Sequence, residues 1–153
     1  MCGKFLVEWF NQFKGIKAYF RDKTEEARRY GYVREDFYGR IRQIPEMRSS
    51  QKFVQEAGAR QACSMAIQGA AQQIMKKAMA DMIPAYKAYR QGGVVCNPLI
   101  QIHDDLMWEV SDEIVEEFVP LLMDTMTSSI KMCVPLRCEA KVGKDWGNME
   151  VWK

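Results

Sequence analysis

Two short apolar segments near residue 100 have the length and the alternation of β-strands. They cover residues 99–102 and 106–110, and only His103, Asp104 and Asp105 separate them. A polar break this short between two alternating segments is typical of a β-hairpin. The pattern therefore predicts a hairpin that carries two adjacent acids at its tip.

Three longer segments have apolar residues at steps of three and four, which is the spacing of one face of an α-helix. They cover residues 4–30, 48–91 and 111–126. The aromatic residues of the first segment would also suit stacking on bases, but their helical spacing favours a core. The residues that we expect to be buried or closely packed are Phe5, Trp9, Phe13, Ile16, Phe20, Phe53, Ala57, Ile67, Ala71, Ile74, Ala78, Met82, Ile114, Phe118, Leu121, Leu122 and Met126.

Single residues predict where these helices begin, bend and end. Ser111 is a candidate N-cap of the third helix, and Gly31 is a candidate C-terminal cap of the first. The residues that we expect to bend or break the helices are Gly15, Pro84 and the pair Gly92-Gly93.

Other alternating segments predict additional strands. Residues 31–33 and 37–45 have the pattern of two strands joined by a turn, and Pro45 is expected to stop the second. Residues 134–146 alternate as a final strand. Together with the hairpin, these segments predict an α+β fold in which long helices pack on a small antiparallel sheet.

The composition is that of a globular protein, since 48% of the 153 residues are hydrophobic and 27% are charged. A chain of this length buries one core, so we expect one compact unit or part of a larger one. The five cysteines form no CxxC pair and there is one histidine, which argues against a zinc site and favours free thiols in a reducing cytosol. Without a membrane-length apolar run or a signal-peptide pattern, we expect a cytoplasmic protein with no membrane partner.

The charge is unevenly distributed along the chain. Residues 1–90 carry 17 Lys and Arg against 9 Asp and Glu, whereas residues 91–153 carry 5 against 11. A basic half suits a polyanion and an acidic half suits cations, a combination expected where nucleic acid meets a metal site. Solvated helix faces would give a similar count.

The two acids of the predicted hairpin are the strongest candidates for chemistry. Adjacent carboxylates repel each other unless a cation neutralises them, and Mg²⁺ prefers oxygen ligands of this kind. An Asp-Asp pair is also ordinary turn chemistry, because Asp tolerates turn dihedral angles. The neighbouring His103 favours a functional site modestly, since a lone histidine is more often structural.

Polar residues form a second candidate site on the helix predicted for residues 48–91. Arg60, Ser64, Gln68, Gln72 and Lys76 follow one another at steps of four and therefore form one polar stripe. These side chains suit phosphates and base edges. The neighbouring residues are small, which permits the close approach of a ligand but would equally permit tight packing on another helix.

Two arginines form a third candidate. Arg40 and Arg42 lie on the same side of an extended segment, since side chains alternate along a strand, so both could face phosphates. A solvated strand edge would carry the same residues.

The segment Leu-Ile-Gln-Ile-His-Asp-Asp-Leu, residues 99–106, resembles motif C of the family A DNA polymerases, the bacterial DNA polymerase I type, in which a strand is followed by Val-His-Asp-Glu. The resemblance implies that Asp104 is a carboxylate ligand of both catalytic metals. It places His103 near the primer end. Asp105 replaces the usual glutamate at the position of an auxiliary acid.

The resemblance continues, in the same order, over nearly the whole chain. Residues 60–76 are similar to the long palm helix whose Arg, Asn and Gln contact the minor groove near the primer end, and Arg60 and Gln68 match directly, whereas Ser64 replaces the Asn. The other similar segments are the aromatic cluster at 9–13, Gly-Tyr-Val at 31–33, the Gly-Arg segment at 39–45 and the ending Val-Pro-Leu…Gly-x-x-Trp at 134–146.

This resemblance implies a division into the helical end of the fingers, residues 1–30, and the C-terminal part of the palm, residues 31–153. It implies a DNA-directed DNA polymerase that uses two Mg²⁺ ions, primer-template DNA and deoxynucleoside triphosphates, associated with replication or the nucleoid. Motif A, a strand with Asp-x-Ser-x-x-Glu, and the nucleotide-binding helix of motif B do not occur in these 153 residues. We therefore expect a split or truncated enzyme, inactive alone and completed by a partner polypeptide; the alternatives are a non-catalytic DNA-binding remnant and, more weakly, an independent metal-dependent phosphodiesterase.

Overall fold

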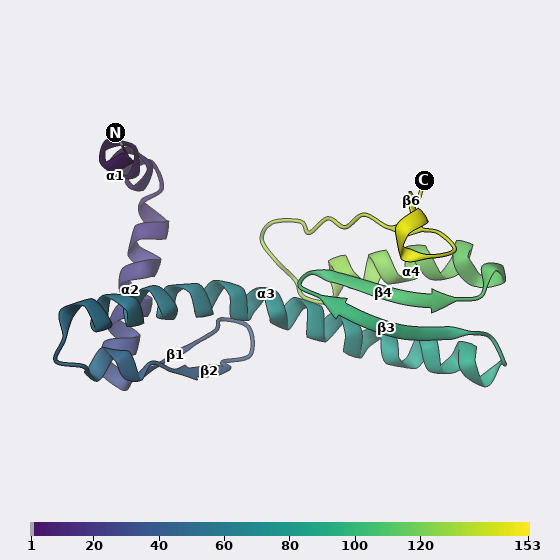
Figure 1. Cartoon of the computed structure of the whole chain (residues 1–153), viewed down its shortest axis with the longest axis horizontal. Coiled ribbons are helices and arrows are strands. Elements are labelled where there is room, and N and C mark those ends of the chain that lie inside the picture. Colours follow the sequence, from purple (N-terminus) through teal and green to yellow (C-terminus); the bar gives the residue numbers. More distant parts are fainter. Residues whose placement is uncertain (1) are drawn as a thin grey trace. The chain divides into compact units, whose positions relative to one another are not determined.

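The computed structural model describes residues 2–153, with side chains from residue 4 onward. The chain forms two compact units, of which the first ends at Ala71 and the second is Gln72–Lys153. A helix of 40 residues, α3 (Lys52–Gln91), contributes residues to both (Figure 1). The predicted boundary at residue 30 separates the fingers from the palm and is a different division from this one. It stays a prediction.

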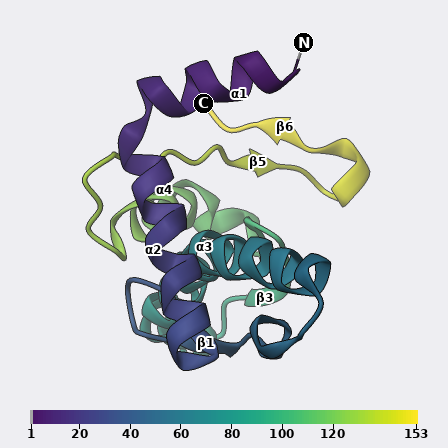
Figure 2. The ribbon, with the colours of Figure 1, turned by 90° about the vertical axis from the view of Figure 1, so that its left-hand side faces the viewer.

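The first unit begins with two helices that a single residue separates. Phe13 has φ −109° and ψ 62°, so it leaves the helical conformation, whereas Gly15 lies inside the second helix and does not cause the predicted bend. The direction of the chain changes at this point (Figure 2). The elements before α3 are α1 (Cys2–Gln12), α2 (Lys14–Tyr30), β1 (Tyr32–Arg34), β2 (Ile41–Gln43) and the 3-10 helix η1 (Pro45–Arg48).

A glycine cap leads from α2 into the small sheet of this unit. Gly31 has φ 76° and donates its N–H to the carbonyl oxygen of Ala27 at 2.8 Å, which confirms the predicted C-terminal cap. The chain then enters β1, which pairs antiparallel with β2. Pro45 begins η1, as expected of a residue that cannot continue a strand.

Small residues of α3 build the core of the first unit. Ala62 and Ala66 are completely buried, and a side chain added at Gly58 would lie 3.0 Å from the side chain of Met47 on η1. This close approach leaves no room for large side chains on that face. The buried cluster consists of Ala27, Val33, Ile44, Met47, Ala62 and Ala66.

Several large residues predicted for the core are exposed instead. Phe5 is 66% exposed on α1, and Phe53 and Ile67 are 68% and 52% exposed on α3. The prediction for α3 was wrong at Phe53 and Ile67, since small residues make the contact in the first unit. It is confirmed at Ala78 and Met82, which are buried. Phe13, at 43%, is exposed at the break between the two helices.

The second unit packs the rest of α3 against a hairpin and another helix. Its elements are β3 (Cys96–Ile102), β4 (Asp105–Val110), η2 (Asp112–Ile114), α4 (Val115–Ser128), β5 (Lys141–Val142), η3 (Trp146–Asn148) and β6 (Glu150–Val151). Phe118 is buried and makes edge contacts with the rings of Trp108 at 5.2 Å and Tyr89 at 6.2 Å between centroids. Met82, Cys96 and Ile114 complete this core.

Local predictions in the second unit have mixed outcomes. The helix α3 continues through Pro84 without restarting and ends at Gln91, where Gly93 adopts φ 82°. Ser111 precedes η2, but its side chain does not cap that helix and instead accepts the N–H of Val95 at 3.1 Å.

The sheets are smaller than the sequence pattern predicted. Only Lys141–Val142 of the predicted final strand is a strand, and it pairs with β6. The described residues form three separate two-stranded antiparallel sheets. Helices combined with small antiparallel sheets confirm the predicted α+β class. None of the described helices is both long and apolar enough to span a membrane.

Candidate metal-binding hairpin and nucleic-acid interface

The predicted hairpin is formed by β3 and β4, which lie side by side (Figure 1). The last pair of the ladder joins Ile102 and Asp105, so only His103 and Asp104 form the turn. Asp105 is the first residue of β4 rather than a turn residue. The three candidate residues are thus brought together at one tip, two in the turn and one at the strand end.

The turn has an unusual backbone conformation. His103 has φ 54°, and it is the one described residue other than glycine with positive φ. A positive φ at the first turn residue alone is the pattern of a type II′ turn, in which glycine normally occupies that position. A residue with a Cβ atom is disfavoured there, and such strain occurs preferentially at functional sites.

Gln101 supports the turn from the neighbouring strand. Its side-chain amide donates to the carbonyl oxygen of His103 at 3.1 Å. The sequence analysis did not identify Gln101 as a site residue, because a polar residue near a strand end has no distinctive spacing. Its position two residues before the histidine was the available signal.

The tip presents its charges to solvent. His103, Asp104 and Asp105 are all exposed, and their side chains form no ion pair or hydrogen bond with other described residues. Two unpaired carboxylates are suitable oxygen ligands for Mg²⁺. The described residues contain no group of three His, Cys, Asp or Glu that could hold a metal ion. The tip therefore fits part of a metal shell, with Asp104 as the predicted ligand.

The first three residues of the polar stripe lie in the first unit, on the outward face of α3, whereas Gln72 and Lys76 belong to the second unit. Arg60, Ser64 and Gln68 are exposed, whereas Ala62 and Ala66, two positions later than the first pair, are buried. Two residues correspond to about 200° around a helix, so the stripe and the packing face are opposite. The packing role of the small residues is confirmed. The contact of the polar residues with a ligand stays a prediction.

Arg42 points toward α3 from the sheet of the same unit. It pairs with Val33, which is buried, and its guanidinium donates to the side-chain oxygen of Gln61 at 3.2 Å. The amide of Gln61 donates in turn to Glu46 at 3.1 Å. These two hydrogen bonds orient one edge of the Arg42 guanidinium, while the Arg42 side chain stays exposed.

Arg40 lies in the loop before β2, so the prediction that both arginines belong to one extended strand was wrong. The buried carboxylate of Glu35 organises this loop by accepting the backbone N–H groups of Phe37, Tyr38 and Arg40 at 2.8 to 3.0 Å. Burial raises the pKa of Glu35, but the three hydrogen bonds outweigh it and hold this pKa below its ordinary value. The sequence analysis missed this role, since it depends on contacts that no periodic pattern shows.

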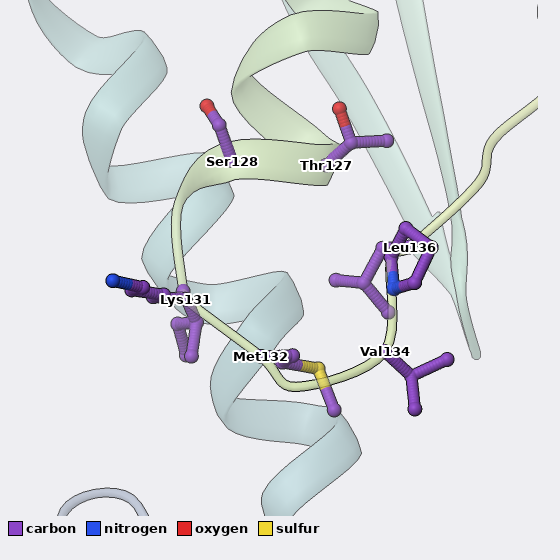
Figure 3. A pocket seen from close by; sticks show the side chains of 8 residues that line it. Thr127, Ser128, Lys131, Met132, Val134 and Leu136 are labelled. Atoms are coloured by element: carbon purple, nitrogen blue, oxygen red, sulfur yellow. The ribbon is translucent and has the colours of Figure 1, made fainter.

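A shallow hollow of about 420 Å³ lies beside the end of α4 (Figure 3). Its lining includes Lys131, Met132, Val134 and Leu136 and contains no carboxylate. It is therefore not a metal site.

Comparison with known proteins shows the family of this chain. Residues 1–148 match the family described as DNA polymerase family A. The chain therefore belongs to this family, which confirms the resemblance that motif C and the palm helix indicated.

Individual relatives agree with this assignment. The chain is 35% identical to the thermostable DNA polymerase I of Thermus filiformis, and the match covers 93% of this chain and 16% of the relative. It is 34% identical to DNA polymerase I of Rhizobium leguminosarum, and that match covers 95% of this chain and 14% of the relative. It also resembles the POL domain of Pol1 from M. smegmatis, solved in complex with DNA primer-template and dNTP, with a TM-score of 0.76, 35% identity and coverage of 86% of this chain and 23% of that chain. The chain thus spans about one seventh to one sixth of the length of these two DNA polymerases.

The strain at the hairpin tip gives a prediction about stability. We expect His103→Gly to be more stable than His103→Ala by about 1 kcal/mol, because glycine adopts positive φ without a Cβ conflict. Both variants lack the imidazole, so their difference in free energy of unfolding isolates the backbone effect. Urea unfolding followed by circular dichroism measures it, and an alanine variant as stable as the glycine variant would contradict the strained turn.

Proposed function

We propose that these residues are part of a DNA-directed DNA polymerase that performs template-directed nucleotidyl transfer by a two-metal mechanism. The observation that carries the proposal is the exposed, unpaired pair Asp104 and Asp105 at the tip of a two-residue turn in a chain of this family. We further propose that motifs A and B, supplied by another polypeptide, complete the site. The substrates are primer-template DNA and deoxynucleoside triphosphates.

Asp104 is the proposed metal ligand of this hairpin. Its position in the turn leaves its carboxylate outside the ladder, where a second strand from elsewhere can approach it. Divalent cations held there would activate the primer hydroxyl and stabilise charge on the transferred phosphate. Asp105 would contribute a second negative charge, from the first position of β4.

His103 is the proposed neighbour of the primer end. Its imidazole projects from a backbone conformation that Gln101 holds through the His103 carbonyl. A side chain on a fixed turn is held in a more defined position than one on a free loop, which suits a positioning role.

The open edge of β3 supports the proposed partner polypeptide. In its two-stranded sheet β3 has β4 on one side only, and Leu99 and Ile100 on this strand are 56% and 47% exposed. An apolar strand with an unpaired edge is a template for another strand. A strand bearing the second metal-binding aspartate would cover this edge and complete the metal shell.

The first unit supplies the proposed contacts with the DNA duplex. Arg60, Ser64 and Gln68 present donors and acceptors on the outward face of α3, suited to the minor groove and its phosphates. The serine offers one hydroxyl where an amide would offer separate donor and acceptor groups, so we expect it to contribute least. Arg40 and Arg42 would bind phosphates.

A non-catalytic DNA-binding protein is the second candidate. The observation that favours it is that the described residues contain no complete metal-ligand group. In that case the polar stripe would bind DNA while the hairpin acids served only the turn.

Single substitutions of the two acids distinguish the polymerase from the non-catalytic protein. In an enzyme completed with motifs A and B, Asp104→Asn should lower the rate of nucleotide incorporation by about a hundredfold or more, since it removes a charge that the cations require. Asp105→Asn, its matched control, should have a milder effect. The measurement is single-turnover incorporation; small and equal losses would exclude Asp104 as the shared ligand.

Substitutions on α3 test the duplex contact. Arg60→Ala and Gln68→Ala should weaken primer-template binding with little dependence on base sequence, and the arginine change should reduce the slope of log affinity against log salt by about one. Fluorescence anisotropy over a range of salt concentrations measures both effects. Unchanged affinity and slope in both variants would leave the stripe without a role in binding.

A further inference from the structure

A pair of stacked tyrosines lies on the surface of the first unit, apart from the stripe on α3. The rings of Tyr30 and Tyr32 are 5.7 Å apart between centroids and inclined by 25°. Gly31 between them has φ 76°, and this reversal of the chain lets residues on either side of the glycine stack on each other. Tyr30 is 49% exposed, so this end of the stack is accessible to solvent.

Guanidinium groups surround this stack. The Cζ atom of Arg29 lies 5.2 Å from the ring centroid of Tyr30, and that of Arg34 lies 5.4 Å from the centroid of Tyr32. Arg34 also donates to the hydroxyl of Tyr32 at 3.2 Å. A third guanidinium, that of Arg48, lies against Gly31, since a side chain added there would be 3.0 Å from its terminal nitrogen.

The charge of these three arginines is not neutralised locally. None of them has a carboxylate within 4.0 Å among the described residues. The nearby acids have other partners: Glu25 pairs with Arg28, and Glu26 accepts the backbone N–H of Arg34 and lies 3.6 Å from Lys23. The surface therefore combines an exposed tyrosine with positive charge that forms no ion pair among the described residues.

The strand geometry keeps this surface separate from the contacts of Arg42. Tyr32 and Arg34 alternate with the buried Val33, so they lie on the outer face of β1. Arg42, which pairs with Val33, lies on the inner face and contacts Gln61 of α3. A ligand on the tyrosines would not compete with that contact.

We propose that Tyr30, Tyr32, Arg29, Arg34 and Arg48 form a binding site for single-stranded nucleic acid. An unpaired base stacks on the exposed ring of Tyr30 in place of the Arg29 guanidinium that lies over it, and the guanidiniums pair with the flanking phosphates. A duplex does not fit as well, since its bases are stacked on each other and cannot reach an aromatic ring. This site does not depend on whether the hairpin takes part in nucleotidyl transfer.

Oligonucleotides with and without bases test the site in the unaltered 153-residue chain. Anisotropy of a labelled single-stranded oligothymidine should show salt-dependent binding, and an abasic strand of the same length should bind about fivefold or more weakly, because it offers phosphates but nothing to stack. Equal affinity for both strands, or equal competition by polyglutamate, would overturn the proposal in favour of an acidic partner.

Variants then locate the contact. Tyr30→Ala should weaken oligothymidine binding by about fivefold or more, Tyr30→Phe should retain it, and Arg29→Ala should reduce the salt dependence. Tyr38→Ala is the matched control, since Tyr38 is 59% exposed in the same unit and stacks on no other described ring. Equal losses in Tyr30→Ala and Tyr38→Ala would overturn the proposed position. These measurements use no primer extension, so their failure is distinct from failure of the proposed function.

Discussion

Only two residues connect β3 to β4, and this short connection determines where the acidic groups lie. The ladder is paired up to Ile102 and Asp105, so Asp104 has no place in the sheet and must project from its end. At the other end of the hairpin, Cys96 is buried, and Trp108 on β4 packs on Phe118. A hairpin with an anchored base and an exposed tip holds charged groups in a defined place at a cost of backbone strain.

A comparable separation of roles occurs on α3. In the first unit its small residues approach η1 so closely that a side chain at Gly58 would meet Met47 at 3.0 Å. The core contacts of α3 in this unit are therefore made by one face of small residues. The opposite face can carry Arg60 and Gln68 without removing any buried contact. Helices that bind a ligand along one side need this division, because a polar group buried in the core would cost free energy.

Local patterns in the sequence predicted much of this structure. The hairpin followed from alternation on both sides of His103, and the end of α2 followed from Gly31, since both depend on neighbouring residues alone. The break at Phe13 could not be predicted, because no propensity favours Phe over Gly15 there.

Individual side-chain hydrogen bonds could not be predicted from the sequence, whether the partner is near or distant along the chain. Ser111 binds Val95 rather than capping its own helix, and Glu35 serves a loop that only the folded backbone defines. The role of Gln101 beneath the turn belongs to the same kind. Such residues occupy polar positions that a binary pattern of apolar and polar residues treats as interchangeable.

Extension of a labelled primer tests most directly whether this hairpin belongs to a shared two-metal site. The reaction would be run with Mg²⁺ by this chain, by a polypeptide carrying motifs A and B, and by their mixture, after complex formation has been verified. Because one strand with an aspartate does not position two metals, we expect extension by the mixture alone. Extension by this chain alone, or an inactive verified complex, would contradict the proposed division of the site.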